Sequence, residues 1–562
     1  MNPDESPLLD LSPATRSVLA AITAAGGRPY LSGGSVRDAL MRSDGRPRDV
    51  DIEVFGLDVD ALVSALRTVG SVDEVGRSFA VLKITRDGED FDVSLPRTEV
   101  KSGPGHNGFT VVADPHIAPQ TAAARRDFTM NALMYDPATG TVLDFFGGVA
   151  DLHAGVLRHS SAAFAEDPLR VLRGAQFAAR FGFAVAPETA VLARSLAPSY
   201  AELPPERVWG EWRKIGEQGV HVSAALVALQ VCGWLEHFPE LARLAGVPQD
   251  PRWHPEGDVL VHSGLAADAA AQLADDAGLT GDDRTVVVLG ALVHDLGKAT
   301  HTQVHPDGRI ISHGHAEAGV APVEDLFGRI GAPAALVARI TPIVREHMVA
   351  TGTVGMPSRP AVRRLARRLA PATMIEWSLV CGGDHGGRGS GSGANPALPW
   401  LAVAASGGVM HEPRKLLLRG DDLIALGLTP GPRFGPVMAA ALEAQDDEEF
   451  DDHAGAVAWL ATAKADGRLE RWLAAVRTKA PRRRSAGRPD AGPSAASAAV
   501  SRRQPPSVEQ SRHDLRLPHL EQVTVERADD HGPPVDSCQS GERSDVSAAR
   551  GQRHRYGAAV GR

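Results

Sequence analysis

The strongest constraint on this chain of 562 residues is a pair of glycines followed closely by a pair of aspartates. Gly33 and Gly34 precede a helix-like segment starting near Val36, and Asp49 and Asp51 open an apolar strand pattern. Side chains two residues apart on a strand share a face, so the two carboxylates are predicted to lie side by side. Paired carboxylates suit Mg²⁺, which usually completes its shell with water and substrate phosphates. The implied substrate is a nucleoside triphosphate.

The glycines fit the same interpretation. They let the backbone approach a phosphate chain closely, and the N-terminus of the following helix points its N–H groups toward it. Taken separately, two glycines are also typical of a turn, and two alternating aspartates of a solvated strand edge. The order and closeness of the two motifs favour the catalytic interpretation.

Composition limits the other function classes. The net charge of −10 carries no basic signature, so a nucleic-acid surface must be a local patch. The three cysteines form no CxxC motif, which argues against a disulfide framework and against a cysteine zinc site. With no apolar signal segment and no run long enough to cross a membrane, the chain is expected to be cytoplasmic.

Two further segments extend the predicted N-terminal domain. Residues 80–84 and 91–95 read as strands joined by a turn at Asp87 and Gly88. Asp92 is either a third acidic group of the site or an alternating polar residue of a half-buried strand. Residues 97–108 are rich in glycine and charge, which is typical of a loop that closes over substrate.

Residues 125–133 place two arginines and small polar groups at the head of a predicted apolar helix. Arginine binds phosphate oxygens in a bidentate manner, so Arg126 and Asp127 are candidates for holding nucleotide. The alternative is a helix-capping network with exposed arginines.

A second predicted helix, residues 166–180, begins with Asp167 followed by proline. Asp167 could simply cap this helix. Chemically, a carboxylate that accepts and an arginine that donates, one turn apart, match the amino group and ring nitrogen of cytosine and adenine. Asp167 and Arg170 are therefore predicted to select C and A without a nucleic-acid template.

These motifs, in this order, resemble the class II CCA-adding tRNA nucleotidyltransferases, and in particular the bacterial multifunctional CCA proteins that carry an HD domain. The resemblance covers residues 28–475 and rests on residues 33–38 (GGSVRD), 48–51 (RDVD), 125–133 (RRDFTMNAL), 166–173 (EDPLRVLR) and 205–211 (PERVWGE). It implies template-independent addition of C, C and A to the 3′ end of tRNA from CTP and ATP.

The resemblance also implies roles for individual residues. Asp49 and Asp51 are the catalytic pair and bind Mg²⁺. Nucleotide is held by Gly33, Gly34, Arg37, Arg126, Asp127, Asn131, Asp167, Arg170 and Arg173. One departure is Gln176, which stands where the family usually has arginine, so one cationic contact is missing.

The second half of the chain carries a histidine and aspartate pattern. An adjacent His294–Asp295 pair at the end of an apolar run is costly unless it is hydrogen-bonded or metal-bound. Candidates elsewhere are His262, His315, His347 and Asp384, and the ordered set His262, His294, Asp295, His315 and Asp384 matches the HD pattern. We expect a divalent transition metal, with Ni²⁺, Mn²⁺ and Co²⁺ as candidates. The resemblance implies 2′,3′-cyclic phosphodiesterase and phosphatase activity.

The predicted fold class is α+β, with a mixed sheet followed by helices. The predicted parts are an N-terminal extension (1–27), a nucleotidyltransferase head (28–156), a helical neck and body (157–255), an HD domain (256–395), a C-terminal helical region (396–478) and a disordered tail (479–562). Residues 359–369 are predicted as an amphipathic helix whose arginines face solvent or, alternatively, the tRNA backbone.

Several alternatives stay open at this point. A poly(A) polymerase, or an enzyme that adds only CC or only A, would share the five motifs. The chain could instead be a metal phosphohydrolase with a degenerate head, or a noncatalytic tRNA-binding protein. The expected partners are tRNA, CTP and ATP, with no membrane, and a homodimer is an open alternative to the monomer.

Overall fold

The computed structural model describes residues 9–42, 50–73, 81–101, 109–353, 355–389 and 394–474. The predictions for Asp49 and for the tail, residues 479–562, lie outside the described residues. Among the described residues, no helix has both the length and the apolar character that a membrane span requires.

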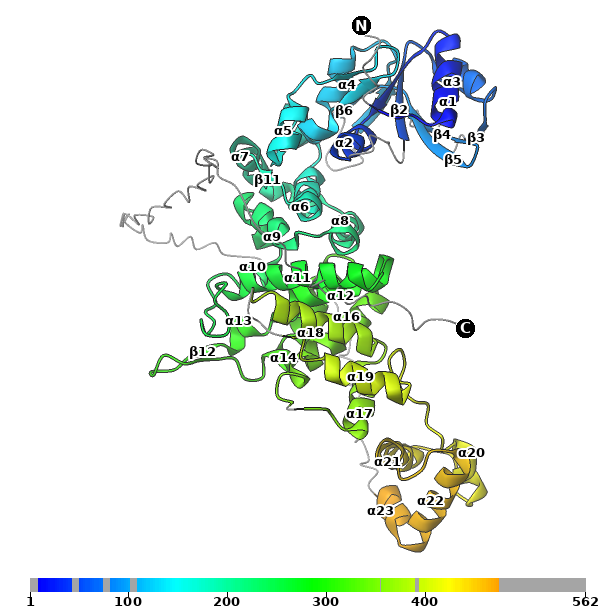
Figure 1. Cartoon of the computed structure of the whole chain (residues 1–562), viewed down its shortest axis with the longest axis vertical. Coiled ribbons are helices and arrows are strands. Elements are labelled where there is room, and N and C mark those ends of the chain that lie inside the picture. The colour runs from blue at the N-terminus through cyan, green and yellow to red at the C-terminus, as the bar shows by residue number, and fades with distance from the viewer. Residues whose placement is uncertain are drawn as a thin grey trace, which may run out of the picture. The chain divides into compact units, whose positions relative to one another are not determined.

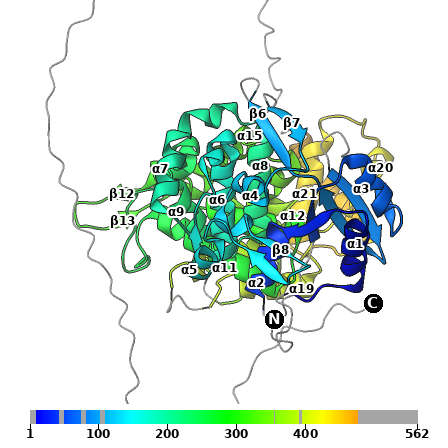
Figure 2. The ribbon, with the colours of Figure 1, turned by 90° about the horizontal axis from the view of Figure 1, so that it is seen from above.

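The N-terminal region is built on a mixed sheet with the strand order β3-β4-β5-β2-β1-β8-β9. Strands β2 and β5 run parallel, while the other neighbouring strands are antiparallel. The strands are β1 (Arg28–Ser32), β2 (Val50–Phe55), β3 (Ser71–Asp73), β4 (Val81–Arg86), β5 (Glu89–Ser94), β8 (Met134–Asp136) and β9 (Thr141–Leu143). A separate antiparallel pair, β6 (Arg97–Lys101) and β7 (Phe109–Ala113), is seen in Figure 2.

Strand alternation separates a core face from a polar face. In β2, Val50, Ile52 and Val54 pack into the core beneath α1 (Pro13–Ala24) and α3 (Val59–Leu66), which lie side by side (Figure 1). Asp51 and Glu53 have the opposite parity and therefore lie on the other face. The remaining helices of this region are α2 (Gly34–Met41), α4 (Pro119–Ala124) and α5 (Gly148–Ala154).

The predicted hairpin is confirmed. Strands β4 and β5 pair antiparallel from Val81 opposite Ser94 to Arg86 opposite Glu89. Asp87 and Gly88 have φ values of 52° and 82°, the left-handed conformation that a tight two-residue turn requires.

The predicted apolar helix over residues 125–133 is wrong. The structure has only a 3₁₀ turn, η2 (Thr129–Asn131), before the chain enters strand β8. The Asp127 carboxylate accepts hydrogen bonds from the N–H of Phe128 and from the Asn131 amide. Short polar side chains that bind nearby backbone compete with helix formation, and here they hold a turn.

From residue 169 the described chain is mainly helical, so the predicted fold class is confirmed. One hydrophobic cluster extends from Phe128 to Val409. The helices contributing to it include α6 (Leu169–Phe181), α7 (Pro187–Ser195), α8 (Pro205–Gln218), α9 (Val222–Val231), α10 (Pro239–Ala242), α11 (Val259–Asp276), α12 (Gly281–Val293), α15 (Val320–Arg329), α16 (Ala334–Glu346), α17 (Arg359–Leu369), α18 (Met374–Gly386) and α19 (Leu398–Gly407). Helices α11, α12, α16 and α18 pack together (Figure 1).

Shorter elements complete this part, among them α13 (Lys298–His301), α14 (His315–Ala318) and the strand pair β12 (Gln303–Val304) and β13 (Ile310–Ile311). A separate small core forms from α20 (Gly420–Ala425), α21 (Phe434–Asp446), α22 (His453–Ala465) and α23 (Arg468–Ala474).

The predicted solvated face of α17 holds for part of the helix, because the Arg359 and Arg368 side chains are 59% and 47% exposed. The Arg363 side chain is only 9% exposed and lies 2.9 Å from a Glu448 carboxylate oxygen. Arg364 and Arg367 pair with Asp447 and Asp446. The acidic residues at and just after the end of α21 neutralise one side of α17, and the buried Arg363 serves packing within the chain.

Candidate active site and metal centre

A cavity of about 680 Å³ lies between the polar face of the sheet and helices α6 and α8. The residues predicted to bind nucleotide or metal in the first half of the chain line it, apart from Asp49, which is outside the described residues. They are Gly33, Gly34, Arg37, Asp51, Arg126, Asp127, Asn131, Asp167, Arg170 and Arg173.

The positive φ of Gly33 favours glycine, and any side chain there would also displace the end of Arg126. A Cβ at Gly33 would stand 2.6 Å from Nη1 of Arg126, and the residue has a φ of 70°. The Gly33 N–H donates to the Leu133 carbonyl (3.2 Å), so this group is part of the fold. Arg126 donates to Ser32 Oγ (2.8 Å) and to Glu53 Oε2 (3.2 Å). Arg126 is therefore fixed at the floor of the cavity.

Asp51 and Asp92 are neighbours across the parallel strands β2 and β5, and both line the cavity. The Asp92 carboxylate is 48% exposed and lies 3.2 Å from Nζ of Lys83. Both interpretations of Asp92 are therefore compatible with its position, since it borders the acidic site and also has a surface partner.

A buried network joins the cavity wall to α6. Asp127 accepts from Asn131 Nδ2 (2.8 Å) and from Arg173 Nε (2.7 Å), and Asn131 in turn accepts from Arg37. Burial alone would raise the pKa of Asp127, but the Arg173 charge and these hydrogen bonds hold it below its usual value. Asp127 is thus an anion that organises Arg37 and Arg173.

Arg37 is 3% exposed, and its guanidinium lies over the rings of Phe177 (5.3 Å) and Phe181 (4.9 Å). Burial lowers the pKa of Arg37, although Asp38 beside it acts in the opposite direction. Arg37 therefore connects α2 to α6 as well as bordering the cavity.

Asp167 and Arg170 both line the cavity, and the Arg170 N–H donates to the Asp167 carbonyl (3.0 Å) in the first turn of α6. Asp167 accepts from the Leu169 N–H (3.1 Å) at the start of α6 and from Arg207 Nη2 (2.8 Å) on α8. Arg170 donates to the carbonyls of Ala163 (2.6 Å) and Arg125 (2.7 Å). Asp167 therefore caps α6 and also lines the cavity.

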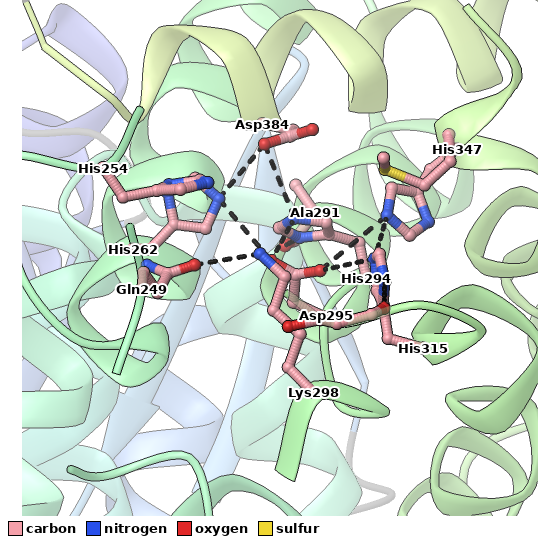
Figure 3. Close-up of polar contacts among 12 residues, drawn as sticks. Gln249, His254, His262, Ala291, His294, Asp295, Lys298, His315, His347 and Asp384 are labelled. Carbon is pink, nitrogen blue, oxygen red and sulfur yellow. Dashed lines mark hydrogen bonds and ion pairs between the residues drawn. The ribbon is translucent and has the colours of Figure 1, made fainter. Parts of the chain in front are cut away.

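The second site is a buried histidine and aspartate cluster (Figure 3). His262 comes from α11, His294 and Asp295 from the end of α12, His315 from α14 and Asp384 from α18. His347, at the end of α16, joins them, with its Nε2 3.1 Å from Nε2 of His315.

In each histidine of the cluster, Nδ1 is already engaged. The Nδ1 atoms lie 2.6–2.7 Å from acceptor oxygens, so Nδ1 carries the proton and Nε2 can offer its lone pair. The acceptors are Glu256 for His262, Ala291 O for His294, Ser312 O for His315 and Val344 O for His347.

The Nε2 atoms converge on two carboxylates. Asp384 Oδ1 lies 3.1 Å from His262 Nε2 and 3.7 Å from His294 Nε2. Asp295 places Oδ2 3.1 Å from His294 Nε2 and Oδ1 3.2 Å from His315 Nε2. Neither oxygen of Asp295 accepts a hydrogen bond of good geometry from the described residues. Apart from Lys298, whose Nζ stands 2.7 Å from Oδ2, the atoms that face this carboxylate are imidazole nitrogens, and such a convergence of lone pairs fits a bound cation.

The protonation states of the cluster also favour a bound cation. Despite burial, neighbouring histidines and Lys298 hold the pKa of Asp295 well below its usual value. Burial is the main reason that the pKa of His347 falls to about 3, which keeps it neutral. Although burial acts in the opposite direction, hydrogen bonds to Asp384 and Glu256 raise the pKa of His262 to about 9, so this imidazole gives up a proton when it binds a metal. Anionic carboxylates and imidazoles that offer Nε2 together form a ligand set for a divalent transition metal.

A second cavity, of about 610 Å³, opens onto this cluster. Lys298 Nζ stands 2.7 Å from Asp295 Oδ2, and Arg388 Nη2 stands 3.0 Å from Asp384 Oδ1. Both cations line the cavity, so a bound anion would find two positive groups beside the ligand cluster.

Comparisons with known proteins agree with the two sites. Residues 29–158 match the poly A polymerase head domain, and residues 259–370 match the HD domain. The multifunctional CCA protein of Xanthomonas campestris pv. campestris (strain B100) is 39% identical over 423 residues, which cover 73% of this chain and 96% of that protein. The chain belongs to the multifunctional CCA protein family.

Another member of the multifunctional CCA protein family, from Xylella fastidiosa (strain M23), is 38% identical over 382 residues, covering 66% of this chain and 86% of that protein. Among solved structures, the Bacillus stearothermophilus CCA-adding enzyme in complex with CTP has a TM-score of 0.54 at 22% identity, with 82% of this chain and 100% of that chain covered. That likeness concerns the fold.

The sequence alone does not place three residues relative to these sites. His347 was a candidate but was left out of the ordered set, because its spacing alone does not place it at the cluster. Arg207 lies in the fifth family motif, yet its pairing with Asp167 could not be foreseen. Gln176, the departure from the multifunctional CCA proteins, is 3% exposed within α6 and is not among the described residues that line the cavity.

Proposed function

We propose that this chain adds C, C and A to the 3′ end of tRNA from CTP and ATP, without a nucleic-acid template. The observation that carries the proposal is that Asp51, the Gly33–Gly34 turn, Arg126 and Asp167 line one cavity. We assign nucleotidyl transfer to residues 28–156 and nucleotide selection to the helical region, residues 157–255.

In the proposed reaction, the tRNA 3′-hydroxyl attacks the α-phosphorus of the nucleotide in line, and pyrophosphate leaves. Asp49 and Asp51 would hold Mg²⁺, which when bound neutralises charge on the triphosphate and makes the hydroxyl more acidic. Arg126, fixed by Ser32 and Glu53, is suited to hold phosphate oxygens. These groups act by positioning and charge and form no covalent bond to the substrate.

For base selection we propose Asp167 as acceptor and Arg170 as donor, with Arg173 in the same pocket. Asp167 already accepts from Arg207, so Arg207 holds the carboxylate in place or exchanges with the base. Gly33, Gly34, Arg37, Asp127 and Asn131 shape the nucleotide cavity around them.

We further propose that residues 256–395 act as a metal-dependent phosphohydrolase on RNA 3′ ends. The ligand atoms form two overlapping groups, His262 with His294 and Asp384, and His294 with Asp295 and His347, and His315 approaches Asp295. When bound there, a divalent transition metal polarises the phosphoryl group and activates water. The candidates are Ni²⁺, Mn²⁺ and Co²⁺, and metal analysis of purified protein distinguishes them.

The deciding experiment offers CTP and ATP, separately and together, to a tRNA that lacks its 3′ CCA end. We expect two C additions with CTP alone and a completed end with both nucleotides, with all addition lost in Asp49→Ala. A long A tail, or refusal of CTP, would instead identify a poly(A) polymerase or an A-only enzyme. If Asp49→Ala left every measurable activity intact, the chain would be a phosphohydrolase with a degenerate head.

A further inference from the structure

One side of the cavity at the histidine and aspartate cluster is apolar. Trp253 and Met348, which line this cavity, are 65% and 42% exposed, and Ile310 and Ile311 of the β12–β13 strand pair also line it. Exposing an indole to water forgoes the stabilisation that burial would give. A ligand with a flat apolar face would cover that surface.

Trp253, which carries the indole, lies in a hydrogen-bonded turn of residues 250–254. The Asp250 carbonyl accepts from the N–H groups of Trp253 (3.0 Å) and His254 (2.9 Å). The Asp250 carboxylate accepts from the Arg252 N–H (3.0 Å) and from its Nη2 (2.6 Å). These four hydrogen bonds hold the backbone of the turn, so the Cα of Trp253 is placed before any ligand arrives.

This turn is also tied to the ligand cluster at both ends. Before it, Gln249 Oε1 accepts from Lys298 Nζ (2.9 Å), and Lys298 contacts Asp295. After it, Glu256 Oε1 lies 2.9 Å from His254 Nδ1 and 2.7 Å from His262 Nδ1. The position of Trp253 relative to the cluster is therefore set by several contacts.

The cavity thus has a cationic and metal-ligating floor and an aromatic side. Its volume of about 610 Å³ falls in the ordinary range for small-molecule sites. A nucleotide has the matching halves, an anionic phosphate and a flat base, and bases stack well on exposed aromatic side chains.

We propose that Trp253 forms a nucleobase-stacking subsite for the terminal nucleotide of an RNA whose 3′-phosphate or 2′,3′-cyclic phosphate lies over the cluster. The subsite rests on the proposed phosphohydrolase function and adds a requirement for a base. Met348 and Ile311 border the same space, while Lys298 and Arg388 face the phosphate side.

The test compares two cyclic phosphates on the metal-loaded, full-length protein. One is 2′,3′-cyclic AMP, and the other is glycerol 1,2-cyclic phosphate, which has the reacting group and no base. We expect Trp253→Ala to raise KM for the nucleotide about tenfold while hydrolysis of the glycerol ester stays within about twofold. Trp253→Phe should restore most of the nucleotide KM. The matched control is Val304→Ala, an exposed apolar residue of β12 that is not among the described residues lining the cavity.

Equal losses on both esters would mean that Trp253 only supports the fold of the site, and no change on either would mean that it contacts no substrate. Either result overturns the proposal. If the wild-type protein hydrolyses neither ester, the phosphohydrolase proposal fails. The subsite is then decided by equilibrium dialysis of 2′,3′-cyclic AMP with CTP in excess to fill the first cavity. Weaker binding to Trp253→Ala supports stacking, and equal binding refutes it.

Discussion

The two polar sites of this chain both contain carboxylates paired with cations, but among the described residues only the second also brings imidazole nitrogens together. In the first cavity, carboxylates and guanidiniums satisfy one another, as Asp127 does with Arg173 and Asp167 does with Arg207. In the second site, the Nε2 atoms of His315 and His347 face each other at 3.1 Å, and both oxygens of Asp295 lack a well-formed hydrogen bond from the described residues.

The difference indicates what each site is built to receive. Paired arginines and carboxylates at an open cavity can exchange partners with a substrate that arrives and leaves. Buried imidazole nitrogens that face each other and two carboxylates are unfavourable unless a cation lies between them, and Lys298 and Arg388 reach only the carboxylates. We therefore expect the first site to be stable without its ligand and the second to depend on its metal.

The largest effect is expected from Asp51→Ala. Losing a carboxylate of the catalytic pair should reduce nucleotide addition by about 10⁴-fold, because the triphosphate charge is no longer neutralised. Phosphohydrolysis should be unchanged, since Asp51 does not line the second cavity. The measurement is tRNA end extension beside cyclic phosphodiesterase activity. The control is Asp90→Ala, on strand β5 but not among the described residues that line the first cavity. A parallel loss of both activities would mean that the two sites are not independent.

The reciprocal variant is Asp295→Asn. Removing the charge of the central carboxylate should lower bound metal and phosphohydrolysis by about a hundredfold or more, with tRNA extension within about twofold. Metal content is measured by mass spectrometry after dialysis. Asp307→Asn, an exposed residue paired with Arg309, is the matched control. Full metal content in Asp295→Asn would show that the cluster is not the metal site.

A smaller effect is expected from Arg207→Ala. Without its partner on α8, Asp167 is less fixed, so we expect about a tenfold loss in kcat/KM for CTP and ATP, together with more misincorporation of UTP. Arg213→Ala, on the same helix and paired with Glu217, should be nearly silent. Equal kinetics for both variants would remove Arg207 from the selecting pocket.

The smallest effect is expected on the free energy of unfolding of Asp127→Asn and its dependence on pH. Because the pKa of Asp127 is held below its usual value, its ion pair stabilises the fold above the unfolded pKa of about 4 and is lost as the pH falls through the folded value. Asp127→Asn should therefore be destabilised at pH 7 by roughly 1–3 kcal/mol, and the gap should close at acid pH. Thermal unfolding at pH 7, 5, 4 and 3 measures it. A gap that did not narrow between pH 5 and pH 3 would contradict the charge-based explanation.

Much of the fold and of the two sites could be predicted from local sequence patterns. The hairpin at Asp87–Gly88 followed from strand alternation and a turn that favours left-handed residues. The α+β class followed from strand patterns ahead of residue 155 and helical patterns after it. The structure brings His262, His294, Asp295, His315 and Asp384 together, as their ordered motif suggested, although their roles stay predictions.

Other features depended on contacts between distant segments. The burial of Arg363 and the pairing of Arg364 and Arg367 could not be predicted, because their partners, Asp446 to Glu448, lie far along the chain. The segment at Thr129 read as a helix because its apolar residues gave no sign that Asp127 would hold a turn.

By itself, the sequence determined which chemical groups this protein has and the local elements that carry them, because spacing fixes which side chains share a strand face or a helical turn. Only the tertiary structure decided which groups meet. Glu256 orients His262, His347 faces His315, and Arg207 reaches Asp167 across 40 residues of chain. Such pairings depend on how helices pack around a common core, and that packing is a property of the whole fold.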